Sequence, residues 1–546
     1  MQAVSVRTAF VQDLEPVADS LALSALVATL PLVTVLVLLG AVRMRAHRAG
    51  LTGLAVAASV AWLAYGMPVA QTASAAAQGV LFGLFPIMWI VVNALWVYRM
   101  TVRTQHFDIL RRSFGRLSDD PRIQALVIAF CFGALLEALA GFGAPVAISA
   151  VMLVALGFEP VKAAVVALVA NTAPVAFGAM GTPVVTLAQV TGLPLDSVAS
   201  VVGRQTPLLA LVVPLVLVFL VDGRRGLRET WVPALVCGAA FAVAQFAASN
   251  YVSAQLADIG AALAGAAALM ALPGARKPAA EPVRAAVLTG VRSEDLDIED
   301  PRREVVRAYA PYGLIVAVFS LAQIPPVKDF LAGATQVFDW PLLDVEGPDG
   351  EPVGANVFTL PLVSTGGTLV LLAGVATAAM IGVRLRPAVR EWLGTVYELR
   401  FAILTVTSVL ALAYVMNLSG QAAVIGHYVA AAGAGLAFLS PVLGWFGVAV
   451  SGSDTSANAL FGALQVTAAR QSGLSPDLLA AANSSGGVLG KMISPQNLTI
   501  ACAAVGLAGK EGDLLRKVLP WSIGLLLVMC LIVVLQSTAV LGWMLP

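Results

Sequence analysis

The sequence predicts an all-α polytopic membrane protein with about 11–14 transmembrane helices. Of its 546 residues, 59% are hydrophobic. Only 12% are Asp, Glu, Lys or Arg, about half the usual share for a soluble globular protein. Apolar runs of roughly twenty residues, the length that crosses a hydrocarbon core, recur along the chain. Gly and Pro, at 49 and 30 residues, also occur inside these runs, where turns alone cannot account for them.

The same composition excludes several classes of function. The net charge of +1 argues against a nucleic-acid partner. The sequence contains no phosphate-binding glycine loop, nucleophile elbow or zinc-protease motif, so we expect no enzyme and no cofactor. The few histidines and cysteines are too scattered for a metal site, and the cysteines are expected to be small buried hydrophobes. They are His47, His106, His427, Cys131, Cys237, Cys502 and Cys530.

The apolar segments predict the following order of membrane spans. The first, Leu21–Ala41, is followed by Arg43, Arg45 and Arg48, which is typical of a retained helix whose N-terminus lies outside and not of a cleaved signal peptide. Several segments contain helix breakers and are expected to be broken or re-entrant. The predicted segments are 21–41, 51–70, 77–98, 123–141, 143–157, 160–178, 205–221, 230–249, 253–272, 309–325, 358–383, 401–418, 421–450, 456–471, 478–509 and 518–543.

The connecting loops predict the orientation, because cytoplasmic loops carry an excess of Lys and Arg. An acidic loop at 326–357, with Lys328 as its only cation, is expected outside the cell. The basic loops are expected in the cytoplasm, and the helices between them alternate in direction as this requires. These basic loops are 42–50, 99–122, 222–229, 274–308 and 384–400.

The chain divides into two predicted halves. Residues 274–308 are rich in Pro, Ala and charge and predict a cytoplasmic linker without chemistry of its own. The N-terminal membrane half is 1–273 and the C-terminal half is 309–546.

Two segments, one in each half, share an unusual pattern. Each begins with small residues that interrupt an apolar run, at 141–145 and at 451–456. From Gly141 to Asn171 is 30 positions, and from Gly452 to Asn483 is 31. A hydroxyl residue and a proline follow each Asn, as Thr182-Pro183 and Ser494-Pro495. We interpret 123–222 and 421–517 as two copies of one unit, and the loop orientations suggest that the copies are inverted.

Paired interrupted helices are the best sequence indication of a transporter's binding site. A break inside the membrane frees backbone N–H and C=O groups that lipid cannot satisfy, so breaks occur where they line a cavity. The N-termini of half-helices carry partial positive charge and attract carboxylates. Close helix packing is the alternative reason for small residues. It explains Gly435 and Gly444 but not the polar runs 451–456 and 483–485.

Charged residues within apolar segments are costly and therefore candidates for function. Burial favours a neutral carboxyl, which makes Glu137 and Asp454 candidates for proton coupling. Lys491 or Arg204 could hold a substrate carboxylate. The alternatives are an internal salt bridge, for example between Asp454 and Lys491, and an interfacial position for Arg204.

The strings LEALAGFGAPVAI (136–148), NTAPVAFGAMG (171–181), SGSDTSANALFG (451–462) and GKMISPQ (490–496) resemble the lactate permease family of proton-coupled 2-hydroxymonocarboxylate transporters. The resemblance implies uptake of L-lactate, D-lactate and glycolate with protons through the inner membrane. Thr182 departs from the aliphatic residue expected there, which leaves the exact substrate open. The family's motif positions fall on Glu137, Gly141, Gly143, Pro145, Asn171, Asp454, Asn458, Lys491, Ser494 and Gln496.

We therefore predict a proton symporter for a small monocarboxylate, embedded in the lipid bilayer. A Na⁺-coupled carboxylate symporter is the alternative of the same class, and a proton channel or a subunit of a membrane complex is the alternative of another class. Glu137 or Asp454 would carry the proton. The predicted substrate-binding residues are Gly141, Gly143, Asn171, Thr172, Thr182, Arg204, Ser451, Ser453, Asn458, Asn483, Ser484, Lys491, Ser494 and Gln496.

Overall fold

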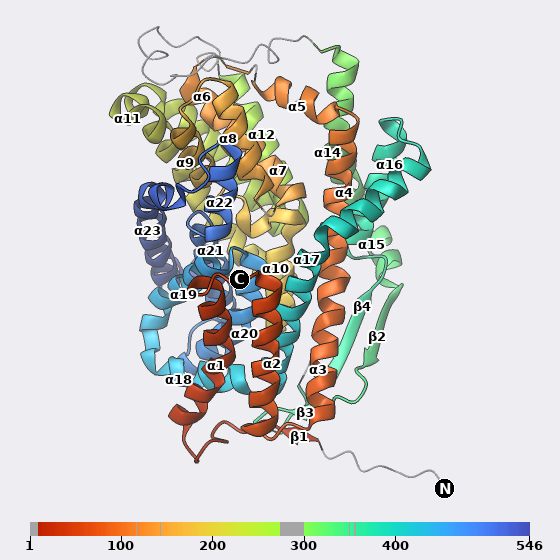
Figure 1. Cartoon of the computed structure of the whole chain (residues 1–546), viewed down its shortest axis with the longest axis vertical. Coiled ribbons are helices and arrows are strands. Elements are labelled where there is room, and N and C mark those ends of the chain that lie inside the picture. The colour runs from red at the N-terminus through yellow and green to blue at the C-terminus, as the bar shows by residue number, and fades with distance from the viewer. Residues whose placement is uncertain are drawn as a thin grey trace.

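A computed structural model describes residues 9–115, 117–118, 120–141, 143–272, 300–348, 350–353 and 356–546. The described chain is almost entirely helical (Figure 1). Most of the predicted linker 274–308 lies outside the described residues, so the division of the chain into two halves stays a prediction. The elements up to that linker are β1 (Phe10–Val11), α1 (Leu21–Gly40), α2 (Ala46–Leu63), α3 (Val69–Phe82), η1 (Gly83–Met88), α4 (Trp89–Arg103), α5 (His106–Gly115), α6 (Pro121–Ala125), η2 (Leu126–Phe132), α7 (Gly133–Ala140), α8 (Ala144–Ala155), α9 (Pro160–Ala170), η3 (Val175–Phe177), α10 (Gly178–Thr191), α11 (Leu195–Tyr251), η4 (Ala254–Leu256) and α12 (Ala257–Ala271).

The second part of the chain adds the acidic loop and a second set of helices. Two short sheets, β1 with β3 and β2 with β4, lie at the end of the molecule where the N-terminal segment also lies (Figure 1). The elements are α14 (Arg302–Ala322), α15 (Pro325–Ala332), β2 (Thr335–Asp339), β3 (Val345–Glu346), β4 (Val357–Pro361), α16 (Gly366–Met380), α17 (Leu385–Leu418), α18 (Gln421–Val429), η7 (Ala430–Gly435), α19 (Leu436–Ser451), α20 (Asp454–Ser472), α21 (Pro476–Lys491), α22 (Pro495–Ala504), α23 (Glu511–Gln536) and η8 (Gly542–Met544).

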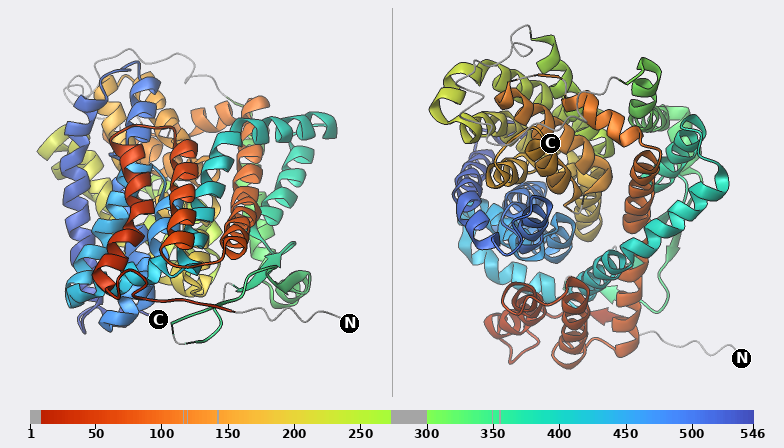
Figure 2. Two further views of the ribbon diagram at one scale, coloured as in Figure 1. Left: turned by 60° about the horizontal axis from the view of Figure 1, so that its bottom comes forward. Right: turned by 45° about the horizontal axis from the view of Figure 1, so that its top comes forward.

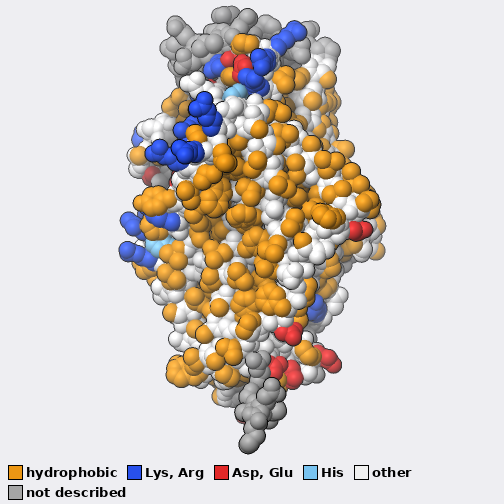
Figure 3. All heavy atoms as spheres, turned by 90° about the vertical axis from the view of Figure 1, so that its right-hand side faces the viewer, with side chains coloured by type: hydrophobic (Ala, Val, Ile, Leu, Met, Phe, Trp, Pro, Cys, Tyr) orange, Lys and Arg blue, Asp and Glu red, His pale blue; other side chains and the backbone are white. Residues whose placement is uncertain are grey.

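The predicted class, an all-α polytopic membrane protein, is confirmed. Within the described ranges, nine helices are long and apolar enough to cross a membrane, or ten if the bent pair α9 and α10 counts as one span. Hydrophobic side chains cover the middle of the face in Figure 3, while Lys and Arg gather in its upper half and a group of acids lies at its lower end. This distribution is expected of a protein surrounded by lipid.

Helix α11 consists of two antiparallel arms joined by a turn. Asp222, Gly223 and Thr230 have non-helical backbone angles inside it. Gly203 faces Ser249, and Gly238 faces the backbone of residues 210–211. The two arms correspond to the separate segments predicted at 205–221 and 230–249.

Two helical hairpins end in the middle of the molecule. In the first, η2 and α7 lead to a break at Gly141 and Gly143, and α8 returns along them, so that the Ser149 hydroxyl donates to the Ile128 carbonyl at 3.4 Å. In the second, α19 leads to a left-handed residue, Gly452 (φ 74°), and α20 returns along α19. Gly447 has no Cβ, which lets the ring of Phe461 on α20 pack directly against α19.

Each hairpin is followed by a broken helix. Helices α9 and α10 are bent by 64°, and Ala179, Met180 and Gly181 are all left-handed at the start of α10. Helices α21 and α22 are separated at 492–494, where Ser494 caps the second helix. The predicted segment 478–509 is therefore two helices. The breaks also differ in register, because Asn171 ends α9 whereas Asn483 lies inside α21.

The two hairpins enter from opposite ends of the molecule (Figures 1 and 2). The first starts at Arg122, which contacts the turn between the arms of α11. The second has its outer ends near the N-terminal segment, since Gln12, Val353 and Arg470 line one cavity. Hairpin and broken helix thus occur twice in the same order with opposite directions.

Several further predicted boundaries are wrong. Residues 384–400 are not a loop, because α17 begins at Leu385 and extends beyond its apolar part, where Glu391 pairs with Arg99 at 2.7 Å. The start of segment 358–383 is strand β4, which pairs with β2, and the helix begins only at Gly366. Segment 421–450 is interrupted at Gly433, whose φ of 54° is incompatible with a continuous helix.

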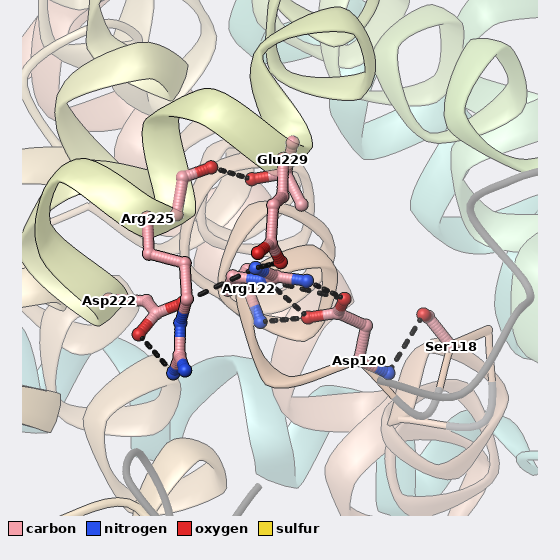
Figure 4. A network of polar contacts seen from close by, with 8 residues as sticks. Ser118, Asp120, Arg122, Asp222, Arg225 and Glu229 are labelled. Carbon is pink, nitrogen blue, oxygen red and sulfur yellow. Dashed lines mark hydrogen bonds and ion pairs between the residues drawn. The ribbon is translucent and has the colours of Figure 1, made fainter. Parts of the chain in front are cut away.

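A buried ionic cluster fixes the outer end of the first hairpin (Figure 4). The Arg122 guanidinium pairs with Asp120 at 2.8 Å, with Asp222 at 3.3 Å and with Glu229 at 2.6 Å. Arg225 adds a second cation on Asp222 at 2.8 Å. The cluster therefore holds the entry of the hairpin against the turn of α11.

Replacing Arg122 with Met should destabilise the protein by about 3–5 kcal/mol, because it leaves buried carboxylates without their cation. The thermal unfolding midpoint of purified protein in detergent measures this. Arg516→Met is the matched control, since Arg516 pairs with Asp513 at the surface and is 84% exposed. Such surface pairs contribute about 0–1 kcal/mol. Equal midpoints for the two variants would contradict a structural role for the cluster.

Candidate functional site

The two hairpin tips and the two broken helices meet around one small cavity. Its volume is about 60 Å³, enough for several water molecules or a small organic acid, since one water needs about 10–15 Å³ by this measure. Backbone freed at the breaks faces this space, as expected where helices are interrupted inside a membrane. The lining residues are Val91, Glu137, Gly141, Val175, Gly178, Ala179, Thr182, Pro183, Gly452, Ser453, Asp454, Thr455, Lys491 and Gln496.

A buried ion pair crosses this cavity from one repeat to the other. Lys491 Nζ at the end of α21 donates to Glu137 Oε1 on α7 at 2.6 Å. The side chains are 9% and 2% exposed. The other carboxylate oxygen, Glu137 Oε2, has no hydrogen-bond partner in the described protein. The alternative of a salt bridge between Asp454 and Lys491 is therefore wrong. Lys491 pairs with Glu137 instead, because the tip of the first hairpin brings Glu137 to the lysine.

Glycine makes room for this carboxylate. A Cβ on Gly178 would lie 2.8 Å from Glu137 Oε1, and one on Gly141 would lie 3.2 Å from the same atom. Both glycines belong to helix breaks, so the breaks admit the side chain of Glu137 as well as freeing backbone groups. A larger residue at 178 would push the carboxylate away from Lys491.

Asp454 belongs to a separate polar network. Its Oδ2 accepts hydrogen bonds from the Ser484 hydroxyl at 2.6 Å and from the Asn458 amide at 3.4 Å. Asn458 also donates to the Pro183 carbonyl at 3.1 Å, and Asn483 donates to Asn458 at 2.9 Å. These bonds join α20, α21 and the broken helix α10. Asp454 thus accepts hydrogen bonds from neutral donors, whereas Glu137 pairs with the charged ammonium group of Lys491.

The predicted substrate-binding residues divide into three groups by position. Thr182, Ser453, Lys491 and Gln496 line the cavity with Gly141. Asn458, Asn483 and Ser484 lie behind Asp454.

The third group lies outside the cavity lining. Arg204 is held by Asn250 at 3.0 Å and by the Met544 carbonyl at 2.5 Å. Thr172 donates to a carbonyl of its own helix, and Ser494 caps α22. The remaining members are Gly143, which faces Ile500, Asn171, whose side-chain amide has no partner in the described protein, and Ser451, which lines the neighbouring cavity.

Two of the larger cavities matter for access to the central one. A vestibule of about 690 Å³ is lined by Arg43, Ser451 and Glu511 and shares Gln496 with the central cavity. A second, of about 420 Å³, is lined by Ser249, Ser253 and Gln255. We call these the Gln496 vestibule and the Gln255 vestibule. The Gln496 vestibule adjoins the site directly.

One buried acid was not predicted from the sequence. Asp258 in α12 is 0% exposed, and its Oδ1 accepts a hydrogen bond from Gln245 Nε2 at 3.1 Å. It is the only charged residue in the predicted segment 253–272, and that signal was present in the sequence. It was missed because Asp258 lies far from both glycine-rich segments. The four cysteines are buried, as predicted.

Comparison with known proteins places this geometry in context. A family model described as L-lactate permease matches residues 24–540. The L-lactate permease of Bacillus subtilis (strain 168) is 42% identical over 98% of this chain and 99% of its own. The L-lactate permease of Escherichia coli (strain K12) is 40% identical over 98% and 99%. The glycolate permease GlcA of the same strain is 39% identical over 96% and 97%.

Proposed function

Because the chain belongs to the L-lactate permease family, we propose that it carries lactate and related 2-hydroxymonocarboxylates, such as glycolate, through a bacterial inner membrane together with protons. Its relatives are named as permeases for lactate and for glycolate, so transport and not catalysis is its function. The observation that carries the proton-coupled proposal is the buried pair of Glu137 and Lys491 where the helix breaks meet.

Lys491 supplies the charge that binds the substrate carboxylate. It is the only cation among the residues lining the central cavity, and a charge-assisted hydrogen bond in a buried site contributes about 1.5–3 kcal/mol. The 2-hydroxyl group would contact Ser453, Thr182 or Gln496, which line the same space. Asn483 is less suited to this role than its sequence position suggested, because its amide already bonds with Asn458.

The ion pair gives a physical reason for proton coupling. A substrate carboxylate that takes Lys491 leaves Glu137 buried without its cation. An unpaired buried charge costs several kcal/mol, so Glu137 takes up a proton when the substrate binds. The loaded site then holds one substrate anion and one proton, and release of the substrate returns Lys491 to Glu137.

The predicted orientation, with the N-terminus and the acidic loop outside, fits the ion pairs of the basic segments. Arg99 contacts Glu391 and Glu398, Arg112 contacts Asp300, and Arg122 contacts Glu229. These contacts gather four of the five basic segments at one end. The positive-inside rule makes that end cytoplasmic.

Purified protein in vesicles tests the function. An inward proton gradient should drive accumulation of labelled L-lactate and should alkalinise the outside medium. Counterflow against unlabelled acids should favour 2-hydroxymonocarboxylates over acids without the hydroxyl. Vesicles without protein are the control.

Each alternative has a distinct outcome in the same vesicles. Uptake that follows an imposed Na⁺ gradient and ignores the pH difference would indicate the Na⁺-coupled symporter. Proton flux without any carboxylate would indicate a channel. Absence of lactate counterflow would exclude lactate transport itself.

A further inference from the structure

The buried acid Asp258 has no part in the transport cycle described above. It lies at the start of α12, which packs against α7 and against both arms of α11. Its side chain is entirely buried, yet none of the ion pairs found in the described residues includes it. Burying an ionised carboxylate without a cation costs free energy, so Asp258 is stable in this position only when it carries a proton or can exchange one.

Helix α12, which carries Asp258, packs against α7, which carries Glu137. A negative charge on Glu137 disfavours a second negative charge near it, and the positive charge of Lys491 favours one. The charges of the ion pair come from α7 and α21, whereas α11 presents the neutral Gln245 to Asp258. A change of protonation at Glu137 therefore alters the free energy of a proton on Asp258.

The segment of chain just before Asp258 lines the Gln255 vestibule. Ser253, Ala254 and Gln255 line this cavity and precede Asp258 by about one helical turn. Ala254 also lies next to Gly181, with 3.3 Å between its backbone and a Cβ placed there. Gly181 belongs to the break of α10, and its neighbours Ala179 and Thr182 line the central cavity, so this part of the vestibule wall lies next to the wall of the central cavity.

Buried polar atoms without a hydrogen-bond partner in the described protein lie on the helices around Asp258 and the ion pair. They include Asp258 Oδ2, Glu137 Oε2 and both side-chain amide atoms of Asn171. Gln245 joins the carboxyl of Asp258 to the segment that follows Asn171, because it also donates to the Ala173 carbonyl at 3.2 Å. Bound water commonly satisfies buried polar atoms of this kind, and a hydrogen-bonded water between two carboxyl groups provides a route for proton transfer.

We propose that Asp258 passes the proton between the Gln255 vestibule and Glu137, so that proton and substrate reach the site by different routes. The proposal rests on the proposed function. Asp258 carries a proton at rest, gives it to the free oxygen of Glu137 and is then reprotonated from the Gln255 vestibule. Asp258 thereby returns to its starting state, and the substrate passes through the central cavity.

Asp258→Asn tests this proposal, because the amide has nearly the same shape but carries no exchangeable carboxyl proton. Proton-driven accumulation of L-lactate should fall by about tenfold or more, as expected when a positioned proton-transfer group is lost. Counterflow should stay within about twofold of the unchanged protein, since exchange of substrate needs no net proton movement. Asp329→Asn, which alters an exposed acid in α15, is the matched control and should change neither rate.

The other outcomes overturn the proposal. If Asp258→Asn accumulates lactate with the original dependence on outside pH, the proton does not use Asp258. If counterflow and accumulation fall together, Asp258 is structural. If a Na⁺ gradient drives lactate accumulation by the unchanged protein but not by the variant, Asp258 is a cation ligand. Lack of lactate counterflow in the unchanged protein would instead contradict the proposed function.

Discussion

Replacing Lys491 with Met should abolish saturable lactate transport. The methionine fills a similar volume but removes the cation of the central cavity, and with it the charge-assisted bond to the substrate carboxylate. A loss of about 3 kcal/mol corresponds to roughly a hundredfold weaker binding. Counterflow of labelled L-lactate in vesicles, measured over a wide range of concentrations, reports this loss without depending on proton coupling.

Lys491→Arg separates charge from geometry. The guanidinium keeps the positive charge but is larger and planar, so it cannot occupy the position of the ammonium group beside Glu137 without displacing its neighbours. We expect partial transport with weakened affinity. Normal counterflow in Lys491→Met would contradict the assignment of the substrate carboxylate to this residue.

Replacing Glu137 with Gln should uncouple lactate transport from protons. Glutamine resembles the protonated carboxyl and leaves Lys491 free for the substrate at all times. Counterflow should therefore persist, with equal or tighter apparent binding, while accumulation driven by a proton gradient disappears. Measuring both in the same vesicles distinguishes lost coupling from lost folding.

The second candidate carboxyl provides the comparison. Asp454 accepts bonds from Ser484 and Asn458, so Asp454→Asn disturbs a neutral network and leaves the Glu137–Lys491 pair intact. For Asp454→Asn we expect proton-driven lactate accumulation to change in proportion to the counterflow rate, so that transport stays coupled to protons. If the two variants exchanged these phenotypes, Asp454 and not Glu137 would be the proton carrier.

Much of the fold followed from local features of the sequence. Apolar length predicted the membrane class, because spanning a bilayer requires about twenty apolar residues whatever surrounds them. Small and polar residues at 141–145 and 451–456 predicted the breaks, which became the two hairpin tips. The boundaries of α17 and β4 were not predictable in this way, because a helix can extend past its apolar part and a strand can precede a membrane helix.

The candidate site was predicted less completely than the fold. Glu137, Lys491 and Asp454 stood out as charges in apolar segments, and all three line the central cavity. Asp258 had the same signal but no neighbouring motif. Arg204 stood out equally and lies against Asn250 and Met544 instead. Charge in an apolar run shows that a residue needs a partner, but it does not identify the partner.

The sequence by itself determined that this chain is a membrane protein with two interrupted helical units and a few buried charges. Composition and helix breakers act through local solvation and backbone geometry, which a sequence records directly. Only the tertiary structure decided that Lys491 pairs with Glu137 and not with Asp454, and that Asp258 lies buried on a helix that packs against α7. The residues of the ion pair are 354 positions apart, and their contact depends on how two hairpins from opposite ends meet.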